Sequence, residues 1–228
     1  MATARYGNEA YAVELAQSVA DREAVYSLRE SEYKTAQSYL LANSAANVRH
    51  RAADSYDDRS FIFACRAITD DGEIVSSPLA TCRFTVPLHG RYELDDLSAA
   101  WPRPPVPAHA LVETSRVVVR RDVRATGLVE VMLLLAGSWV LRETTHRYNF
   151  AVCARPLERL YARLGMGLTS NDEITLRGRP ANRRYVVIYG DMLTSRPAVE
   201  ARLRKRGWDL SDSDRKNFST TSIRKAGT

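Results

Sequence analysis

The sequence predicts a mixed α/β fold, in which a mostly antiparallel sheet with one parallel pair of strands is flanked by helices. Segments rich in β-branched residues alternate along the chain with segments of helical periodicity. Residues 61–68 and 79–86 are two strand-like segments around an Asp-Gly turn signal, so they are expected to pair antiparallel. Residues 111–119 and 148–154 are strand-like segments separated by an apolar helix, and this order favours parallel pairing.

Local signals predict the first elements of the chain. Residues 11–15 alternate Tyr, Val and Leu on one face, which predicts the first strand. Ser18 and Asp21 resemble a capping box, which predicts a helix from there to about Tyr33. Residues 34–53 are rich in Ala, Ser and Asn and are open to two interpretations, a second helix or a mobile flap.

The second half of the chain continues the alternation of strands and helices. Residues 87–108 hold five of the nine prolines, so an irregular insertion with one short helix at 94–101 is expected before the strand at 111–119. After the strand at 148–154 the sequence predicts a helix at 156–164, a polar stretch at 171–184, a strand at 185–189 and a basic helix at 196–206. Residues 211–228 are polar and without periodicity, and are expected to be disordered.

Length and composition predict a single domain over residues 1–228 with its core at about 10–192. A hydrophobic content of 45% and a charged content of 26% are ordinary for a globular protein. No apolar run reaches the roughly 18 to 20 residues that a membrane-spanning helix needs, and the start of the chain has no apolar core of a signal peptide. The protein is therefore expected to be cytoplasmic.

Cysteines and histidines are placed without the spacing of metal ligands. The cysteines lie in apolar strand-like segments and are expected to be reduced core residues; they are Cys65, Cys82 and Cys153. The histidines form no pair at helical spacing; they are His50, His89, His109 and His146. No metal site is expected.

A carboxylate stands out inside the strand at 111–119. The two-residue repeat of a strand places Glu113 and Ser115 on one face, together with apolar neighbours that include Leu111, Val117 and Val119. A Glu in such surroundings is desolvated, so its pKa is expected to rise toward neutrality. A carboxylate tuned in this way suits a general base, and the alternative is a structural ion pair between Glu113 and an arginine.

A basic loop, Arg120 to Gly127, follows this strand and opens a helix. Free backbone N–H groups at a helix N-terminus, with Arg121 and Arg124 beside them, are suited to hold a phosphate group.

Strand, basic loop and helix in this order resemble the acyl-donor site of the GNAT-fold N-acyltransferases. The strand residues Glu113-Thr114-Ser115-Arg116 resemble the E-x-S-R signature of two GNAT branches, the N-acyl amino acid synthases and the acyl-homoserine-lactone synthases. The loop departs from the usual GNAT pattern of Arg or Gln, two residues, Gly, one residue, then Gly or Ala. If that pattern ends at Gly127, Asp122 and Ala125 stand where Arg and Gly belong.

A second segment, Ser55-Tyr56-Asp57-Asp58, resembles the S-Y-D segment of the lactone synthases. That family carries another acidic residue three positions after the first Asp, where this chain has Ser60. The departure favours the amino acid branch over S-adenosylmethionine as the amine substrate. The resemblance also implies substrate-binding roles for Asp57, for Arg29 in the first helix and for Arg83, whose alternative role is a cross-strand ion pair with Glu73.

The resemblance implies that the parallel strands are splayed to admit a thioester arm, and that a fatty acyl group passes from the thioester to an amine. Glu113 would take the proton, Ser115 would orient Glu113 or the substrate, and Arg116 would anchor Glu113 or an acceptor carboxylate. The loop residues Arg121, Arg124 and Gly127 would hold the phosphate of the arm. The implied co-substrate is the acyl-phosphopantetheine of acyl carrier protein, or acyl-CoA, with no permanently bound cofactor.

The net charge of +6 fits an acidic partner, and only four of the 33 basic residues are lysines. Three arginines at four-residue spacing, Arg155, Arg159 and Arg163, are a candidate contact for acidic carrier protein or else a solvated basic face. No nucleic acid partner is expected. Three alternatives remain open: a lactone synthase, a small-acyl CoA transferase, and a non-catalytic GNAT-like domain that binds nucleic acid or protein through its arginines.

Overall fold

The computed structural model describes residues 1–36, 52–180 and 182–210. Most of the segment predicted as a second helix or a flap, and the whole of the tail at 211–228, lie outside the described residues. None of the helices in the described ranges combines the length and the apolar composition needed to cross a membrane.

Within the described residues, nine strands form one sheet in the order β7-β8-β6-β5-β4-β3-β2-β1-β9. Neighbouring strands pair antiparallel except β5 and β6, which pair parallel. This arrangement confirms the predicted fold class. The strands are β1 (Ala2–Tyr6), β2 (Glu9–Leu15), β3 (Ser60–Ile68), β4 (Ala80–Thr85), β5 (Leu111–Val119), β6 (Tyr148–Ala154), β7 (Gly167–Leu168), β8 (Tyr185–Asp191) and β9 (Trp208–Leu210).

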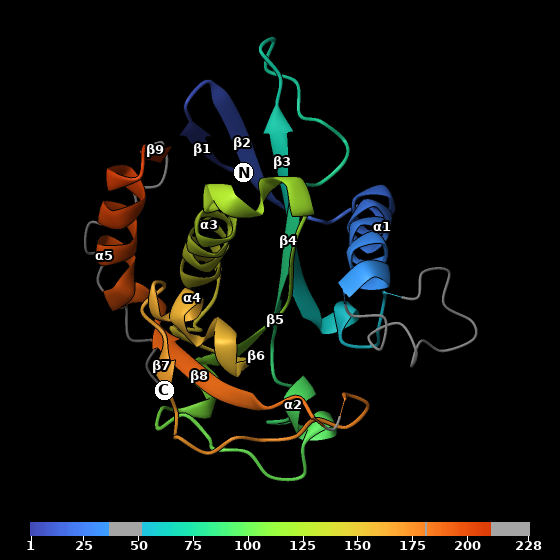
Figure 1. The fold of residues 1–228 in the computed structure, drawn as a ribbon, viewed down its shortest axis with the longest axis vertical. Helices are drawn as coiled ribbons and strands as arrows, with labels where there is room; N and C mark the ends of the chain where they lie inside the picture. The colour runs from blue at the N-terminus through green and yellow to red at the C-terminus, as the bar shows by residue number, and fades with distance from the viewer. Residues whose placement is uncertain (37–51, 181, 211–228) are drawn as a thin grey trace, which may run out of the picture.

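Helices cover both faces of the sheet (Figure 1). On one face α3 and α5 pack over a large core that contains Leu128, Met132 and Trp208. On the other face α1 lies against β3, β4 and β5, and α2 lies beside the ends of β5 and β6 over a separate aromatic cluster. The helices are α1 (Val19–Ala36), α2 (Glu93–Leu97), α3 (Leu128–Glu143), α4 (Glu158–Ala162) and α5 (Met192–Lys205).

Several predicted boundaries agree with the structure. The Ser18 hydroxyl accepts a hydrogen bond from the Asp21 backbone N–H at 3.0 Å, and the Asp21 carboxylate accepts one from the Ser18 N–H at 3.3 Å, so the capping box is present. Gly72, with φ of 87°, makes the turn between β3 and β4 that the Asp-Gly signal predicts.

Other predictions are wrong at the edges of the sheet. The first strand of the chain is β1 rather than 11–15, and β1 and β9 pair with each other beyond the predicted core limits. Helix α5 begins at Met192 rather than Arg196, because the Asp191 carboxylate accepts hydrogen bonds from two backbone N–H groups of its first turn. The short helix α2 begins and ends earlier than predicted.

Strands β5 and β6 pair over only part of their length. Their register runs from Leu111 opposite Tyr148 to Thr114 opposite Ala151, although β5 continues to Val119 and β6 to Ala154. The two strands therefore diverge beyond Thr114, which is the splay that the resemblance implies.

A β-bulge in β5 accompanies this divergence. On β4, Thr81 and Arg83 are two residues apart, but their partners Val118 and Ser115 on β5 are three residues apart. The extra residue allows Arg116 to adopt a φ of 51°, a left-handed conformation that costs about 1–3 kcal/mol in a non-glycine residue. The bulge also reverses the faces of the strand: Val118 packs toward α1, whereas Val117 and Val119 pack toward the large core. The prediction that Val117 and Val119 share the face of Glu113 is therefore wrong.

Candidate active site

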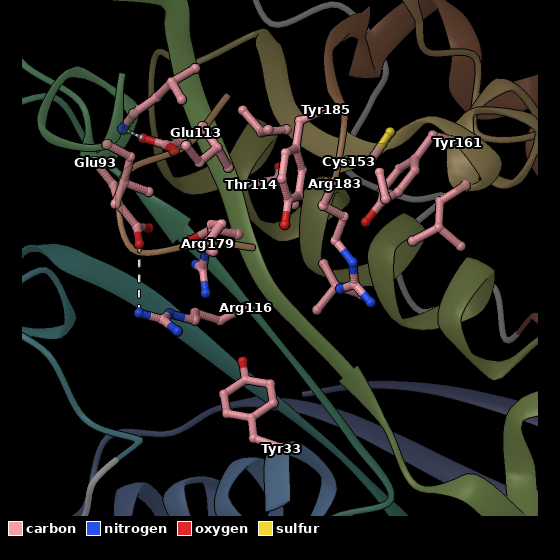
Figure 2. Close-up of a pocket in the computed structure, with 18 residues that line it drawn as sticks. Tyr33, Glu93, Glu113, Thr114, Arg116, Cys153, Tyr161, Arg179, Arg183 and Tyr185 are labelled. Carbon is pink, nitrogen blue, oxygen red and sulfur yellow. Dashed lines mark hydrogen bonds and ion pairs between the residues drawn. The ribbon is translucent and has the colours of Figure 1, made fainter. Parts of the chain in front are cut away.

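A cavity of about 170 Å³ opens where β5 and β6 diverge; we call it the Glu113 cavity (Figure 2). Strand β5 contributes Glu113 through Val117, and α2 contributes Glu93 and Leu94. Other elements contribute further polar side chains. Tyr161 comes from α4, and the segment between β7 and β8 provides Arg179 and Arg183.

Glu113 is the most strongly desolvated carboxylate of this cavity, with only 3% of its surface exposed. Its Oε2 accepts a hydrogen bond of 3.3 Å from the Leu94 backbone N–H. Burial, and secondarily the negative charge of Glu93, raise the pKa of Glu113 to about 8, and the positive charge of Arg83 offsets only part of this rise. Near neutral pH the side chain is therefore mostly protonated but close to its titration midpoint, and its ionised fraction can serve as a general base.

Glu93 connects Glu113 to a group of buried charges. It occupies the first position of α2, where the helix dipole favours an anion, and 5% of its surface is exposed. Its carboxylate pairs with Arg83, and Arg116 Nη2 lies 3.6 Å from Glu93 Oε1. Among the described residues no arginine forms an ion pair with Glu113 itself, so the alternative of a structural ion pair at Glu113 is wrong.

Three arginines and three carboxylates form a network behind the cavity; they are Arg29, Arg83, Arg116, Asp54, Asp57 and Glu93. Arg83 is its centre: Nη1 lies 2.5 Å from Asp54 Oδ1 and 2.8 Å from Asp57 Oδ1. The charges of this network cancel, three positive against three negative, which is how buried charges remain tolerable. Arg83 pairs with these carboxylates rather than with Glu73, so the cross-strand alternative is wrong.

The predicted substrate-binding residues Arg29, Asp57 and Arg83 lie within this network. Arg29 and Arg83 are fully buried, and Asp57 is 2% exposed. None of the three lines the Glu113 cavity in the part of the chain that the structure describes. Arg83 pairs with Glu93, which does line the cavity, and shares Asp54 with Arg116, which lines it too.

Ser115 and Arg116 both line the cavity, with contacts that the sequence does not reveal. The Ser115 hydroxyl accepts a hydrogen bond of 3.1 Å from Arg83 Nε. Arg116 Nη2 donates to Asp54 at 2.5 Å, so Arg116 anchors Glu113 only indirectly, through Glu93. The positive φ of Arg116 turns this side chain toward the carboxylates.

A second cavity, of about 350 Å³, continues along the outer half of β5; we call it the Val118 cavity. Its walls are mostly apolar and include Val118, Val129 and Leu160. Tyr33 and Tyr161 line both cavities, so the two spaces meet at these phenol rings. A long thin group lying along β5 would thus reach from the Val118 cavity to Glu113.

The basic loop lies at the outer end of the Val118 cavity, and its arginines have internal partners. Arg124 Nη2 lies 2.6 Å from Glu32 Oε2, and the Arg121 backbone N–H donates to Glu32 Oε1 at 3.2 Å. The side chain of Arg121 is exposed. Gly127 caps α3 with a φ of 89°, a conformation that glycine adopts without strain.

Sequence reasoning missed Glu93, Arg179, Arg183, Tyr33 and Tyr161 as site residues. Glu93 opens a helix of only five residues, and Arg179 and Arg183 lie in an irregular segment, so no periodicity marks a face for any of the three. Tyr33 and Tyr161 lie in predicted helices, and nothing in the sequence indicates that both cavities meet at their phenol rings. Burial raises the pKa of Tyr161, which keeps its hydroxyl protonated.

The described residues contain no group of three or more His, Cys, Asp or Glu side chains that could hold a metal ion. Cys65, Cys82 and Cys153 are buried free thiols, and burial raises the pKa of Cys153 to about 12. Cys153 lines the Glu113 cavity as an uncharged thiol.

Solved structures resemble this geometry. One is a CoA-dependent acyl-homoserine lactone synthase, BjaI, with SAM and isopentyl-CoA: the TM-score is 0.58 at 15% identity, over 86% of this chain and 90% of that chain. Another is TofI in a ternary complex with an inhibitor and MTA, with a TM-score of 0.52 at 18% identity over 83% and 96% of the two chains. A third is an acyl-CoA N-acyltransferase from Pseudomonas aeruginosa, with a TM-score of 0.51 at 14% identity over 80% and 99%.

The chain has the GNAT fold. No protein-family model matches the sequence, and no curated protein matches it either. At 13–18% identity, the structural similarity extends to the arrangement of strands and helices. Within the GNAT fold of this chain, the divergence of β5 and β6 and the two cavities along β5 define the candidate active site.

Proposed function

We propose that this protein is an N-acyltransferase that moves an acyl group from a thioester to the amine of an amino acid or a related acceptor. One observation carries the proposal: a buried carboxylate with a pKa of about 8 faces the cavity at the point where the parallel strands diverge. Such a group can accept a proton near neutral pH, either from an ammonium group before it attacks or from the amine as it attacks. Its position beside an apolar cavity along β5 suits a thioester arm.

In the proposed reaction the amine attacks the thioester carbonyl while Glu113, directly or through one water, takes the proton. Beyond Thr114 the edge of β5 that faces β6 leaves the ladder, so its backbone N–H groups are available to the carbonyl oxygen. The C–S bond then breaks, and Tyr161, whose hydroxyl stays protonated, would give its proton to the leaving thiolate. Transfer of the proton from Glu113 back to Tyr161, directly or through solvent, restores both groups and completes the cycle.

The donor is proposed to be acyl carrier protein, with acyl-CoA as the second choice. The Val118 cavity has an apolar lining suited to a phosphopantetheine arm and is lined by Arg124 of the basic loop, whose Arg121 and Gly127 are proposed to hold the phosphate with it. The exposed arginines Arg159 in α4 and Arg155 in the turn before it fit an acidic carrier protein. BjaI, which has a similar fold, binds isopentyl-CoA, and this supports the CoA alternative.

A lactone synthase is the second candidate, because BjaI is such an enzyme with SAM bound. The local chemistry at Ser60 favours the amino acid acceptor instead. The Ser60 hydroxyl donates to the Tyr56 carbonyl oxygen at 2.6 Å and lies 2.9 Å from the Thr85 hydroxyl. It contributes no negative charge for a sulfonium ion.

Mass spectrometry of complete reactions tests the proposal. The purified protein is incubated with all amino acids and S-adenosylmethionine, and separately with long-chain acyl carrier protein or acyl-CoA. An N-acyl amino acid is expected, with activity lost in Glu113→Gln and kept in Glu73→Gln, which changes an exposed carboxylate in the β3–β4 turn. An acyl lactone would support the second candidate. No product from either donor, with a folded wild-type protein, would reject the proposed function.

A further inference from the structure

The wall of the Glu113 cavity opposite β5 is formed by the segment between β7 and β8. This segment is fixed at several points. The Arg177 backbone N–H donates to the Leu97 carbonyl at 2.8 Å, which ties it to α2, and Ile174 and Tyr185 form a bridge with bonds of 2.8 and 3.2 Å. Leu176 is buried in the aromatic cluster under α2. Side chains carried by this wall therefore have a defined position relative to Glu113.

Two arginines of this wall reach into the cavity. Two turns, in which the Arg179 N–H donates to the Leu176 carbonyl at 3.1 Å and the Arg183 N–H to the Pro180 carbonyl at 3.0 Å, orient the segment. Figure 2 shows both guanidinium groups within the cavity, with that of Arg179 extending toward Arg116. Within the described residues, the arginines of the charge network behind β5 are Arg29, Arg83 and Arg116.

The chemistry of the two walls is different. Arg116 on β5 is already bound by Asp54 and Glu93, so its charge serves the network. A guanidinium group has five N–H donors and holds a carboxylate with two of them, so Arg179 and Arg183 can bind a ligand while keeping contacts with the protein. The cavity of about 170 Å³ is smaller than the roughly 300–1,000 Å³ of drug-sized sites, which restricts it to a small acceptor.

We propose that Arg179 and Arg183 form the acceptor-recognition site, which binds the carboxylate of a small amino acid while its amine faces Glu113. The inference rests on the proposed function and narrows it. A carboxylate on the carbon next to the amine becomes a requirement for binding, and amines that lack it, such as amino acid amides and amino alcohols, are poor acceptors. The two arginines act in substrate binding rather than in proton transfer.

Steady-state kinetics separates this role from a structural one. In the Arg179→Met, Arg183→Met double variant, the KM for the amino acid acceptor should rise about 10- to 100-fold, the effect of losing charged hydrogen bonds, with kcat little changed. The KM for the corresponding amino acid amide should be high in the wild type and unchanged in the variant. Arg177→Met is the matched control, since Arg177 is an exposed arginine of the same segment outside the cavity. Thermal unfolding checks that each variant folds.

Calorimetric binding of N-octanoylglycine and N-octanoylglycinamide provides a readout that needs no turnover. The wild type and Arg177→Met should bind the carboxylate at least 10-fold more tightly than the amide, and the double variant should bind both equally. Equal binding by the wild type, or no binding of either probe, would overturn the inference. Acyl transfer to amides as efficient as to amino acids would overturn the inference about Arg179 and Arg183 while leaving the proposed function intact. Carboxylate-selective binding without any turnover would reject the proposed function alone.

Discussion

Asp54 and Glu113 are carboxylates on the two sides of one cluster of charges, and their pKa values move in opposite directions. Burial pushes the pKa of Asp54 upward, but Arg83 and Arg116 outweigh it and lower that pKa to about 2. Glu113 is more deeply buried, and its hydrogen bonds within the described residues come from backbone N–H groups. The charge of Glu93 adds to the effect of burial, so the pKa of Glu113 rises to about 8. The comparison teaches that direct pairing with guanidinium groups, rather than burial alone, decides which carboxylate becomes a base.

Removal of the Glu113 carboxylate, which has no guanidinium partner among the described residues, is expected to have the largest effect on the acyl-transfer rate. Glu113→Gln keeps the shape of the side chain and removes the base, so the acyl-transfer rate should fall by about 10²- to 10⁴-fold. Steady-state kinetics on the acyl transfer measures the loss. A rate within a few-fold of wild type would mean that the unpaired carboxylate is not the base.

Removing the arginine that pairs with Asp54 should lower the stability of the fold instead. Arg83→Met leaves Asp54, Asp57 and Glu93 without their central partner, and removing one member of a buried charge network costs about 3–5 kcal/mol of unfolding free energy. Chemical denaturation measures the change. Arg120→Met is the control, because it breaks an exposed pair with Asp122 that should contribute little to stability. Equal losses of unfolding free energy in the two variants would contradict the view that the buried charge network stabilises the fold.

The pH dependence of stability should distinguish the two carboxylates. A group whose pKa is raised on folding stabilises the protein below its unfolded pKa, and this stabilisation is lost as pH rises through the folded pKa. The stability of Glu113→Gln relative to wild type should therefore increase by a few kcal/mol, as an order of magnitude, between about pH 4.5 and 8. Asp54 acts in the opposite sense, since its contribution is present above about pH 3.8 and is lost as pH falls through about 2. Urea denaturation at several pH values measures both trends; a pH-independent difference would contradict the raised pKa.

A smaller effect is expected when the neighbouring charge is removed. Glu93→Gln eliminates the anion beside Glu113, so the pKa of Glu113 should fall and the rising limb of the pH–rate profile should move to lower pH by on the order of one unit. Asp96→Asn, an exposed carboxylate of the same helix, should leave the limb in place. If the rising limb of the pH–rate profile moved equally in both variants, the cause would be a general change in charge rather than the interaction between Glu93 and Glu113.

The central strands were accessible to sequence reasoning because their signals are local. The β-branched runs at Leu111–Val119 and Tyr148–Ala154 coincide with β5 and β6, and the two-residue repeat correctly identifies Glu113 as a buried carboxylate. Strands β1 and β9 are short and contain charged residues, so they become strands only through pairing with each other and with β2.

The surroundings of Glu113 depend on contacts between distant residues. Asp54 meets Arg116 across 62 positions of sequence, and Arg83 meets Asp54 across 29, so no local pattern encodes the network. The bulge at Arg116 is likewise invisible in a run of strand-forming residues, and it reverses the predicted faces of Val117 and Val119. Arg179 and Arg183 belong to an irregular segment whose position is fixed by α2.

The most direct test of the account is the titration of Glu113 itself. Carbon-13 NMR of protein labelled at the glutamate side-chain carboxyl groups, compared with Glu113→Gln to assign the signal, follows this one group against pH. The account predicts a midpoint at about pH 8, with the carboxylic acid form dominant at neutral pH. A midpoint near the ordinary value of 4.5 would show that Glu113 is charged throughout the neutral range and would contradict its role as a base tuned by burial.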